Sequence, residues 1–332
     1  MGYWMDYLGA TGCREGDALK LDSAKYVFHG GILRQRSVYT PNQAQTAGAF
    51  GFKWARRDAY KSGRVQKDFY KWLAERYLQN DASKLKKWLF PGARVLDAGC
   101  GASMSALLLF KAYFNTVRYL GVDISPAVDV AKKAFEKKRF RGEFIQADLM
   151  DLPFKKPVFD LIFSEGVLHH TNSTEKAFKY LSGFLVKGGR FLFYVYARKS
   201  PIREFSDDLI RNYILKAGDK EAWDALMPLT KLGKIIGDLN ITIKVPRGIP
   251  CLGIPKGPIN LQRLFYWHIF KAYYKKNWNL EELNCVNYDW YRPLNCHRQT
   301  PEEVRKWCRM SGIKIEHMDM QESGITVVGV KR

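Results

Sequence analysis

The sequence lacks several features that would place it in specialised classes of protein. Its 332 residues contain no run of about 18 uncharged apolar residues, which excludes a transmembrane helix. Its six cysteines are widely scattered without a C-x-x-C pair, so we predict neither a disulfide scaffold nor a zinc ribbon, and we expect a reducing cytoplasm. No ligand cluster has the spacing of a metal site. The first residues, MGYWMD, do not predict a secretory signal.

Acidic residues are scarce beside basic ones, and the net charge is +21. The excess is spread along the chain, with eight basic residues over acidic ones in 1–90, six in 91–198, six in 199–299 and one in 300–332. The densest basic run lies between Lys132 and Arg141. Such charge is typical of proteins that attract nucleic acid, an anionic membrane or an acidic substrate, but it equally fits a solvated helix face.

Short apolar segments alternate with helical segments from residue 94 onward. The expected strands span 94–98, 119–123, 143–147, 161–164 and 190–196. Helices are expected between them, including one over 126–139 that begins at Pro126 and one over 174–186 that Gly188 and Gly189 follow. This alternation predicts an α/β fold, in which helices cover both faces of a mostly parallel sheet.

Two stretches stand outside this rhythm. Residues 1–40 show little periodicity and suggest loop or extended cover, whereas apolar spacing predicts a helix over 66–89. Residues 199–299 are too long for an ordinary loop, so we expect a cap that includes a helix near 201–217. The predicted regions are an N-terminal extension or lid at 1–90, a core at 91–198, a cap at 199–299, and a closing helix with strands at 300–332.

The strongest chemical signal is VLDAGCGAS at residues 95–103. The expected strand ends at Asp97, and Gly99 and Gly101 follow in a tight turn into a helix. Glycines are suited to that turn because a side chain would keep a ligand from lying against the backbone. A nicotinamide-type G-x-G-x-x-G would need glycine at position 104, where Met104 stands, so that class of dinucleotide site is disfavoured.

Further features follow in register behind this turn. Asp123 ends the second expected strand, where a carboxylate can accept both hydroxyls of a ribose. Asp148 ends the third, within FIQADLMDLPF, where a carboxylate can accept the exocyclic amine of adenine. The segments FDLIFSEGVLHHT (159–171) and LVKGGRFLFYVY (185–196) then supply a fourth strand with its exit loop and a fifth strand.

With these motifs, the chain resembles the class I S-adenosylmethionine-dependent methyltransferases that have a type-11-like core. The resemblance covers 94–198, with 300–332 as the closing helix and strands. It implies a Rossmann-like sheet, mostly parallel with an antiparallel last strand, which carries an N-terminal extension and a long insertion after strand five. It also implies S-adenosylmethionine as the cofactor. Ser103 departs from the family pattern, since many members carry a third glycine there.

The resemblance implies specific roles for individual residues of this sequence. The turn after the first strand lines the methionine end of the cofactor, Asp123 binds the ribose, Asp148 and Leu149 hold the adenine, and Ser164 and Glu165 border the sulfonium. The full implied set of cofactor-binding residues is Asp97, Ala98, Gly99, Cys100, Gly101, Asp123, Ile124, Asp148, Leu149, Ser164 and Glu165.

Two histidines, His169 and His170, follow the fourth strand and are candidates for a general base. A neutral imidazole suits that role near pH 7, and His170 is the better catalytic candidate. The structural interpretation, in which one histidine caps the next helix and the other packs beneath it, is favoured over catalysis. Four residues near the end of the cap either reach the same mouth or pack the cap: Tyr288, Tyr291, His297 and Arg298.

Aromatic residues are concentrated in 1–90 and 199–299, and they predict either an aromatic-walled substrate pocket or the packing of the cap onto the core. Three functions follow. The favoured one is methyl transfer to a small or medium-sized metabolite, such as a natural product, sugar or lipid-like acceptor, by direct displacement under the lid. The alternatives are an RNA methyltransferase and a non-catalytic cofactor-binding scaffold. Diffuse charge and the absence of an RNA-binding module disfavour RNA. The segment 273–276, Tyr-Tyr-Lys-Lys, suggests peripheral membrane contact.

Overall fold

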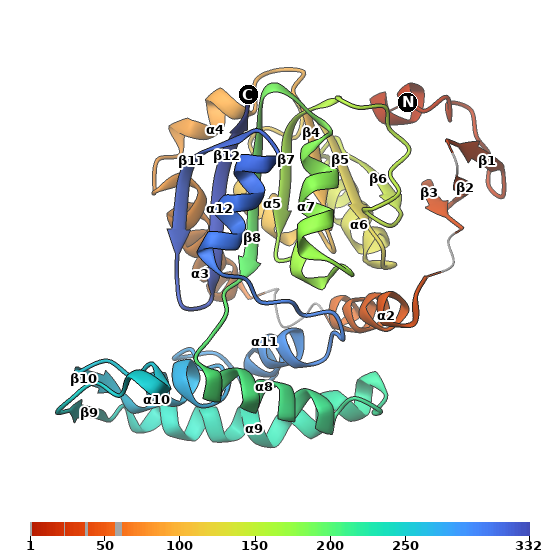
Figure 1. The fold of residues 1–332 in the computed structure, drawn as a ribbon. Coiled ribbons are helices and arrows are strands. Elements are labelled where there is room, and N and C mark those ends of the chain that lie inside the picture. The colour runs from red at the N-terminus through yellow and green to blue at the C-terminus, as the bar shows by residue number, and fades with distance from the viewer. Residues whose placement is uncertain (1, 23, 37–38, 57–61) are drawn as a thin grey trace.

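The computed structural model describes residues 2–22, 24–36, 39–56 and 62–332. A ten-stranded sheet forms its centre, in the order β1-β2-β3-β6-β5-β4-β7-β8-β12-β11 (Figure 1). The strands are β1 (Ala18–Leu21), β2 (Ala24–His29), β3 (Ile32–Gln35), β4 (Arg94–Ala98), β5 (Arg118–Asp123), β6 (Glu143–Gln146), β7 (Phe159–Glu165), β8 (Leu185–Tyr196), β11 (Ile313–Met320) and β12 (Gly324–Lys331).

The middle of this sheet is parallel and its margins are antiparallel. Strands β3, β6, β5, β4, β7 and β8 pair in parallel, whereas β1, β2, β12 and β11 join through antiparallel pairs. The predicted fold class, with its antiparallel last strand β12, is therefore confirmed. Because parallel strands end at one edge of a sheet, Asp97, Asp123 and Glu165 are brought to the same edge by β4, β5 and β7.

Helices cover both faces of the sheet, and each face has its own apolar core. The helices outside the cap are α1 (Tyr3–Tyr7), α2 (Pro41–Ala55), α3 (Gly63–Leu73), the π-helix η2 (Ala74–Leu78), α4 (Ser83–Trp88), α5 (Met104–Leu109), α6 (Ala127–Lys138), the 3-10 turn η3 (Leu168–His170), α7 (Thr174–Ser182) and α12 (Pro301–Met310).

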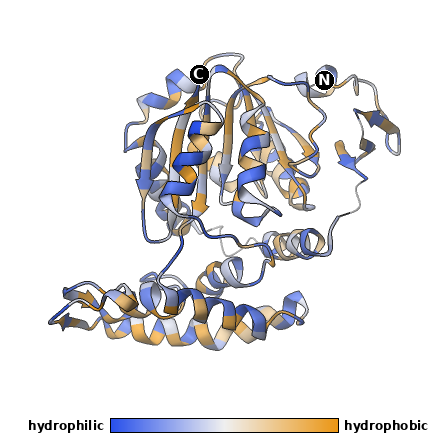
Figure 2. Cartoon of the chain, in the orientation of Figure 1, coloured by the Kyte–Doolittle hydropathy of each residue, from blue (hydrophilic) through white to orange (hydrophobic). Residues whose placement is uncertain are grey.

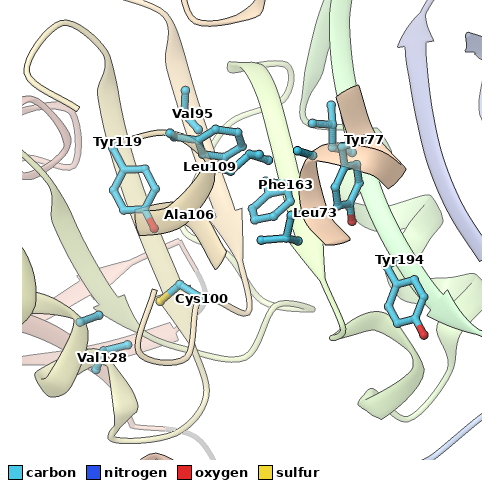
Figure 3. Close-up of a cluster of buried hydrophobic side chains, with 14 of the residues drawn as sticks. Leu73, Tyr77, Val95, Cys100, Ala106, Leu109, Tyr119, Val128, Phe163 and Tyr194 are labelled. Carbon is cyan, nitrogen blue, oxygen red and sulfur yellow. The ribbon is translucent and has the colours of Figure 1, made fainter. Parts of the chain in front are cut away.

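One core includes Phe178 of α7 and Trp307 of α12, which pack with Phe191 of β8. The other core lies on the opposite face, where Tyr77 and Phe163 contact each other edge to face (Figure 3). Figure 2 shows that hydrophobic residues are concentrated in the central strands between these layers. Apolar side chains therefore pack on both faces of the sheet, and this packing holds in place the strand ends that carry the motif residues.

The cap is formed by helices and one hairpin below the edge where β8 ends (Figure 1). Its elements are α8 (Pro201–Tyr213), α9 (Asp219–Leu239), β9 (Thr242–Val245), the 3-10 turn η4 (Pro250–Leu252), β10 (Gly257–Asn260), α10 (Leu261–His268) and α11 (Leu280–Tyr291). The chain enters and leaves the cap side by side. Ala197 bridges Gln299 in parallel, and the Gln299 N–H donates to the Tyr196 carbonyl at 2.8 Å.

Several predicted elements differ from the structure. The helix predicted over 66–89 is interrupted, because Gln79 and Asn80 take positive φ angles of 54° and 61° between η2 and α4. The expected loop or extended cover of 1–40 contains three strands, and β3 pairs with β6. The helix expected to run to residue 186 ends at Ser182, and Gly188 and Gly189 lie within β8 rather than before it.

Candidate active site

A cavity of about 500 Å³ lies between the sheet edge and the cap. We call the cavity-lining residues of 97–196 the core wall and those of 263–289 the cap wall. Helices α2 and α3 line a third side, with residues between Gln43 and Trp72. The core wall includes every predicted cofactor residue in the described chain except Ala98 and Ser164. Ser164 is buried, and its hydroxyl donates to the Ala98 carbonyl at 2.9 Å, so these two residues support β4 and β7.

The glycine turn after β4 is held tightly in place. The Gly99 N–H donates to the Val122 carbonyl at 2.8 Å, and the Gly101 N–H donates to the Asp123 carboxylate at 2.8 Å. Both glycines have positive φ angles, of 83° and 51°. A Cβ at Gly99 would overlap the Val167 side chain. A side chain is therefore excluded here by conformation and by space, which leaves bare backbone facing the cavity.

Asp97 is a buried acid at the start of this turn, and only 3% of its surface is exposed. The Tyr119 hydroxyl donates to its carboxylate at 2.5 Å. Burial raises the pKa of Asp97 to about 7, and the negative charges of Asp123 and Glu165 add to that effect, while the Tyr119 hydrogen bond opposes it. A cationic group placed beside Asp97 would offset the cost of this buried charge.

Asp123 and Asp148 stand at or just after the next two strand ends, and hydrogen bonds orient both. Asp123 accepts the Ser125 N–H at 2.8 Å and the Ser125 hydroxyl at 2.6 Å, in addition to the Gly101 N–H. Burial nevertheless raises its pKa above the ordinary value. Asp148 accepts the Gln43 side-chain amide of α2 at 2.7 Å. Helix α2 is thereby joined to the core wall at the position predicted to hold adenine.

Glu165 at the end of β7 is compensated by a buried arginine. An Arg76 nitrogen donates to one carboxylate oxygen at 2.6 Å, and the Tyr77 hydroxyl donates to the other at 2.5 Å. Arg76 is fully buried between the rings of Trp72 and Tyr194, with its guanidinium 3.4 and 4.4 Å from their centroids. The π-helix η2 places two consecutive residues on one carboxylate, a local widening found often at functional sites.

His170 lines the cavity, whereas His169 lies behind it. The Nδ1 atom of His170 lies 2.7 Å from the Asn295 carbonyl, so we assign it the proton, and its buried Nε2 has no protein partner among the described residues. Burial lowers the pKa of His170 to about 4, while the negative charge of Asp289 opposes the decrease. His170 is therefore neutral near pH 7, and its buried Nε2 lone pair accepts no hydrogen bond from the described residues. His169 packs on Tyr196, with ring centroids 3.7 Å apart, and burial lowers its pKa well below the usual range.

The cap wall is rich in aromatic and charged side chains. Asp289 of α11 accepts the Lys53 ammonium of α2 at 2.5 Å and the Tyr196 hydroxyl at 3.4 Å. Aromatic residues from α10 and the segment that follows it complete the wall: Tyr266, Trp267, Tyr273 and Trp278.

The four cap residues left open by the sequence lie away from the cavity. Tyr291 donates to Asp207, and Tyr288 donates to Asp219. His297 lies 3.0 Å from the Thr171 carbonyl, and Arg298 pairs with Glu204 and Asp208. The cap-packing interpretation therefore describes their contacts. Sequence reasoning missed Arg76, Tyr77, Lys53, Asp289 and Lys271, since none belongs to a motif.

The core wall fits S-adenosylmethionine by its chemistry. Gly99 and Gly101 line the cavity without side chains of their own, and Val167 and Trp54 pack against them. Three carboxylates, Asp97, Asp123 and Asp148, line the same cavity, and these groups can accept an ammonium, ribose hydroxyls and an adenine amine. Over the described residues, no group of three or more His, Cys, Asp or Glu side chains is arranged to hold a metal ion. None of the helices in that part of the chain is long and apolar enough to cross a membrane.

Comparison with known proteins shows that the core of the chain is similar to methyltransferases. Residues 96–193 match the family model described as "Methyltransferase domain". The probable tRNA methyltransferase 9B of Bos taurus is 33% identical over 120 residues, which cover 35% of this chain and 24% of that protein. The ribosomal protein L11 methyltransferase of Thermosipho africanus is 35% identical over 148 residues, which cover 44% of this chain and 52% of that protein. The chain therefore spans about a quarter to a half of the length of these curated relatives.

Solved structures align over more of the chain at lower identity. The magnesium protoporphyrin IX methyltransferase of Synechocystis PCC 6803, with bound SAH, aligns with a TM-score of 0.47 and 14% identity. The alignment covers 88% of this chain and 100% of that one.

Proposed function

We propose that this chain is a class I S-adenosylmethionine-dependent methyltransferase, with residues 96–193 as its methyltransferase domain, and that it methylates a small or medium-sized metabolite bound beneath the 199–299 cap. The observation that carries the proposal is a single cavity, which joins the motif residues of the core wall to the aromatic side chains of the cap wall. An acceptor in that cavity would meet the cofactor away from bulk water. A natural product, sugar or lipid-like molecule fits such a space. The cysteine spacing supports action in the cytoplasm.

The core wall binds and orients the cofactor in this proposal. Asp97 holds the α-ammonium, Asp123 the ribose hydroxyls, and Asp148 the adenine amine. When bound, S-adenosylmethionine supplies a methyl carbon that an acceptor lone pair attacks while the carbon–sulfur bond breaks, leaving S-adenosylhomocysteine. Catalysis by the protein then consists mainly of alignment and the exclusion of water.

His170 is the residue proposed to take the proton of the acceptor. Its Nε2 is unpartnered within the described chain, lies in a side chain that lines the cavity, and is unprotonated near pH 7. The Asn295 carbonyl holds the tautomer that leaves Nε2 free to accept. His169 is proposed as a positioning residue, because it packs on Tyr196 behind the wall.

RNA is the second candidate acceptor, and the net charge of +21 favours it. The densest basic run begins on the last two turns of α6 and continues to Arg141. Helix α6 starts beside Ile124 of the cavity and ends at Lys138, which is about 18 Å away along its axis. The run begins at Lys132, about 8 Å along the axis from the start of α6, and extends away from the cavity to Arg141. Most of its charge therefore lies at the far end of the helix, which favours the metabolite.

Calorimetry with S-adenosylmethionine and S-adenosylhomocysteine tests the cofactor part of the proposal. We expect micromolar binding by the wild type, weakened at least tenfold, or about 1.4 kcal/mol, in Asp123→Ala. Asp224→Ala is the matched control, since Asp224 pairs with Lys220 on the exposed face of α9. Normal binding by Asp123→Ala, or no binding by a folded wild type, would overturn the proposed site.

Radiolabelled methyl transfer into fractionated cell extract tests the acceptor. We expect the label in a fraction below about 1 kDa, insensitive to ribonuclease and protease. Ribonuclease-sensitive incorporation would instead establish RNA as the acceptor. Cofactor binding without incorporation into any fraction would support the non-catalytic scaffold.

A further inference from the structure

Two cationic side chains on the cap wall lack the acidic partners that other cations in the cavity have. Lys271 follows α10 and is only 6% exposed, and Arg263 lies within α10. Both line the cavity. Across the described residues, neither forms an ion pair with a carboxylate. The Lys271 ammonium lies 4.5 Å from the centroid of the Trp290 ring, and the Arg263 guanidinium lies 5.5 Å from that of Tyr266.

Three acids that line the cavity are already compensated. Asp289 pairs with Lys53 at 2.5 Å. Asp68 accepts the Trp278 indole N–H at 3.1 Å and lies 3.6 Å from the Lys275 ammonium. Glu165 is held by the Arg76–Tyr77 pair described above. Protein groups therefore balance these three acids, and Lys271 and Arg263 are left without a carboxylate partner in the described part of the chain.

A buried ammonium without a counter-ion is costly, so it needs a reason to be retained. Burial lowers the pKa of Lys271 to about 7, and the positive charge of Arg203 adds to this, whereas Asp289 and Asp207 oppose it. An anion beside Lys271 would restore its proton and remove the cost. The aromatic side chains around both cations would hold the apolar part of the same molecule.

We propose that the methyl acceptor carries an oxyanion, a carboxylate or a phosphate, which Lys271 and Arg263 bind at the cap wall. The inference rests on the proposed function, because the acceptor and the cofactor share one cavity. It narrows the substrate to an acidic metabolite with an apolar or aromatic body.

Three small probes of one shape test the proposal: benzoate, phenyl phosphate and benzamide. Each is titrated by ligand-observed NMR into full-length protein saturated with S-adenosylhomocysteine. We expect benzoate or phenyl phosphate to bind at least tenfold more tightly than benzamide. The better of the two identifies the oxyanion.

Variants locate the anion site. Lys271→Met and Arg263→Gln should each weaken binding of the favoured anion at least tenfold and leave benzamide unchanged. Lys199→Met is the matched control. Lys199 is half-buried, its buried ammonium has no hydrogen-bond partner in the described chain, and burial lowers its pKa to about 7, as for Lys271, yet it lies outside the cavity lining. It should change the affinity less than twofold.

The outcomes are separable from those of the proposed function. Normal S-adenosylhomocysteine binding, together with equal affinity for the three probes, no probe binding, or equal effects of Lys199→Met and Lys271→Met, would overturn the anion site alone. Absence of S-adenosylhomocysteine binding would overturn the proposed function first. If Lys271→Met does not fold, Lys271→Gln and Arg263→Gln provide the same comparison.

Discussion

The core wall and the cap wall of the cavity differ in whether their charged side chains have partners within the protein. On the core wall, Asp97, Asp123 and Glu165 each accept hydrogen bonds from neighbouring protein groups, so their positions are set before a ligand arrives. On the cap wall, Lys271 and Arg263 have no acidic partner within the described residues. In the proposed function, the difference teaches that the core wall binds the cofactor with acids already held by protein hydrogen bonds. The cap wall instead leaves two cations to be paired by the acceptor.

The largest effect should follow from breaking the compensation of Glu165 on the core wall. Arg76→Met removes a fully buried cation and leaves the carboxylate unbalanced, which should lower the free energy of unfolding by about 3–5 kcal/mol. Denaturant unfolding measures it. The double variant Arg76→Met/Glu165→Gln should recover much of the loss. A single variant as stable as wild type would show that the pair is not needed.

The next effect concerns the proposed base between the two walls. His170→Gln should lower kcat about hundredfold, because general bases contribute on that scale, and should leave S-adenosylhomocysteine affinity within twofold. Steady-state kinetics on the acceptor identified from extract measure it. His297→Gln serves as the control, since His297 lies outside the cavity lining. Equal rates for both variants would assign His170 a packing role.

A smaller effect should appear in the stability of the cofactor-free protein as pH changes. The pKa of Asp97 is raised to about 7 in the folded state, so folding retains a proton that the unfolded chain releases near its ordinary value of 3.8. Stability contributed by that proton is present below about pH 4 and is lost as the pH rises to 7.

Asp97→Asn removes this titration. As the pH rises from 5 to 8, the free energy of unfolding of the variant should increase by about 2 kcal/mol relative to that of the wild type. This change corresponds to a rise of a few degrees in the relative Tm. Scanning fluorimetry at both pH values measures the difference. Asp160→Asn, which alters a half-buried pair with Arg94, should show no such pH-dependent gain. A pH-independent difference for Asp97→Asn would contradict the assignment.

The smallest effect should come from the contact between α2 and the core wall. Gln43→Ala removes one hydrogen bond to Asp148 and should weaken cofactor binding about fivefold, or ~1 kcal/mol. Calorimetry compares it with Gln66→Ala on α3, which lies outside the cavity lining. An unchanged affinity would mean that α2 covers the cofactor without holding it.

The core wall could be predicted from the sequence because parallel strands end at the same edge of the sheet and their side chains alternate between its two faces. These two rules fix the positions of the motif residues. Asp97, Asp123 and Glu165 reach one edge for that reason. Ser164 illustrates the limit, since alternation along β7 turns its side chain away from the face used by Glu165, and it bonds Ala98 instead. The family resemblance supplied the role of Ser164 but not its orientation.

The cap wall could not be predicted, because its contacts depend on tertiary packing. Lys53 and Asp289 are 236 residues apart in sequence, and nothing local marks them as a pair. The positions of Arg76 and Tyr77 depend on a π-helix, in which an extra residue per turn changes which side chains share a face, and apolar spacing alone predicts an ordinary helix. Strands β1 to β3 were missed because they are short and pair at the margin of the sheet.

The paired entry and exit of the cap have an evolutionary consequence. Because the chain leaves at Tyr196 and returns at Gln299, which are joined by backbone hydrogen bonds, the two covalent connections of 199–299 to the core lie side by side. A lineage can therefore exchange or redesign this segment as one cassette without shifting the register of β8 or β12. In the proposed function, different stretches of the gene encode acceptor preference and cofactor use, so the two would diversify at different rates.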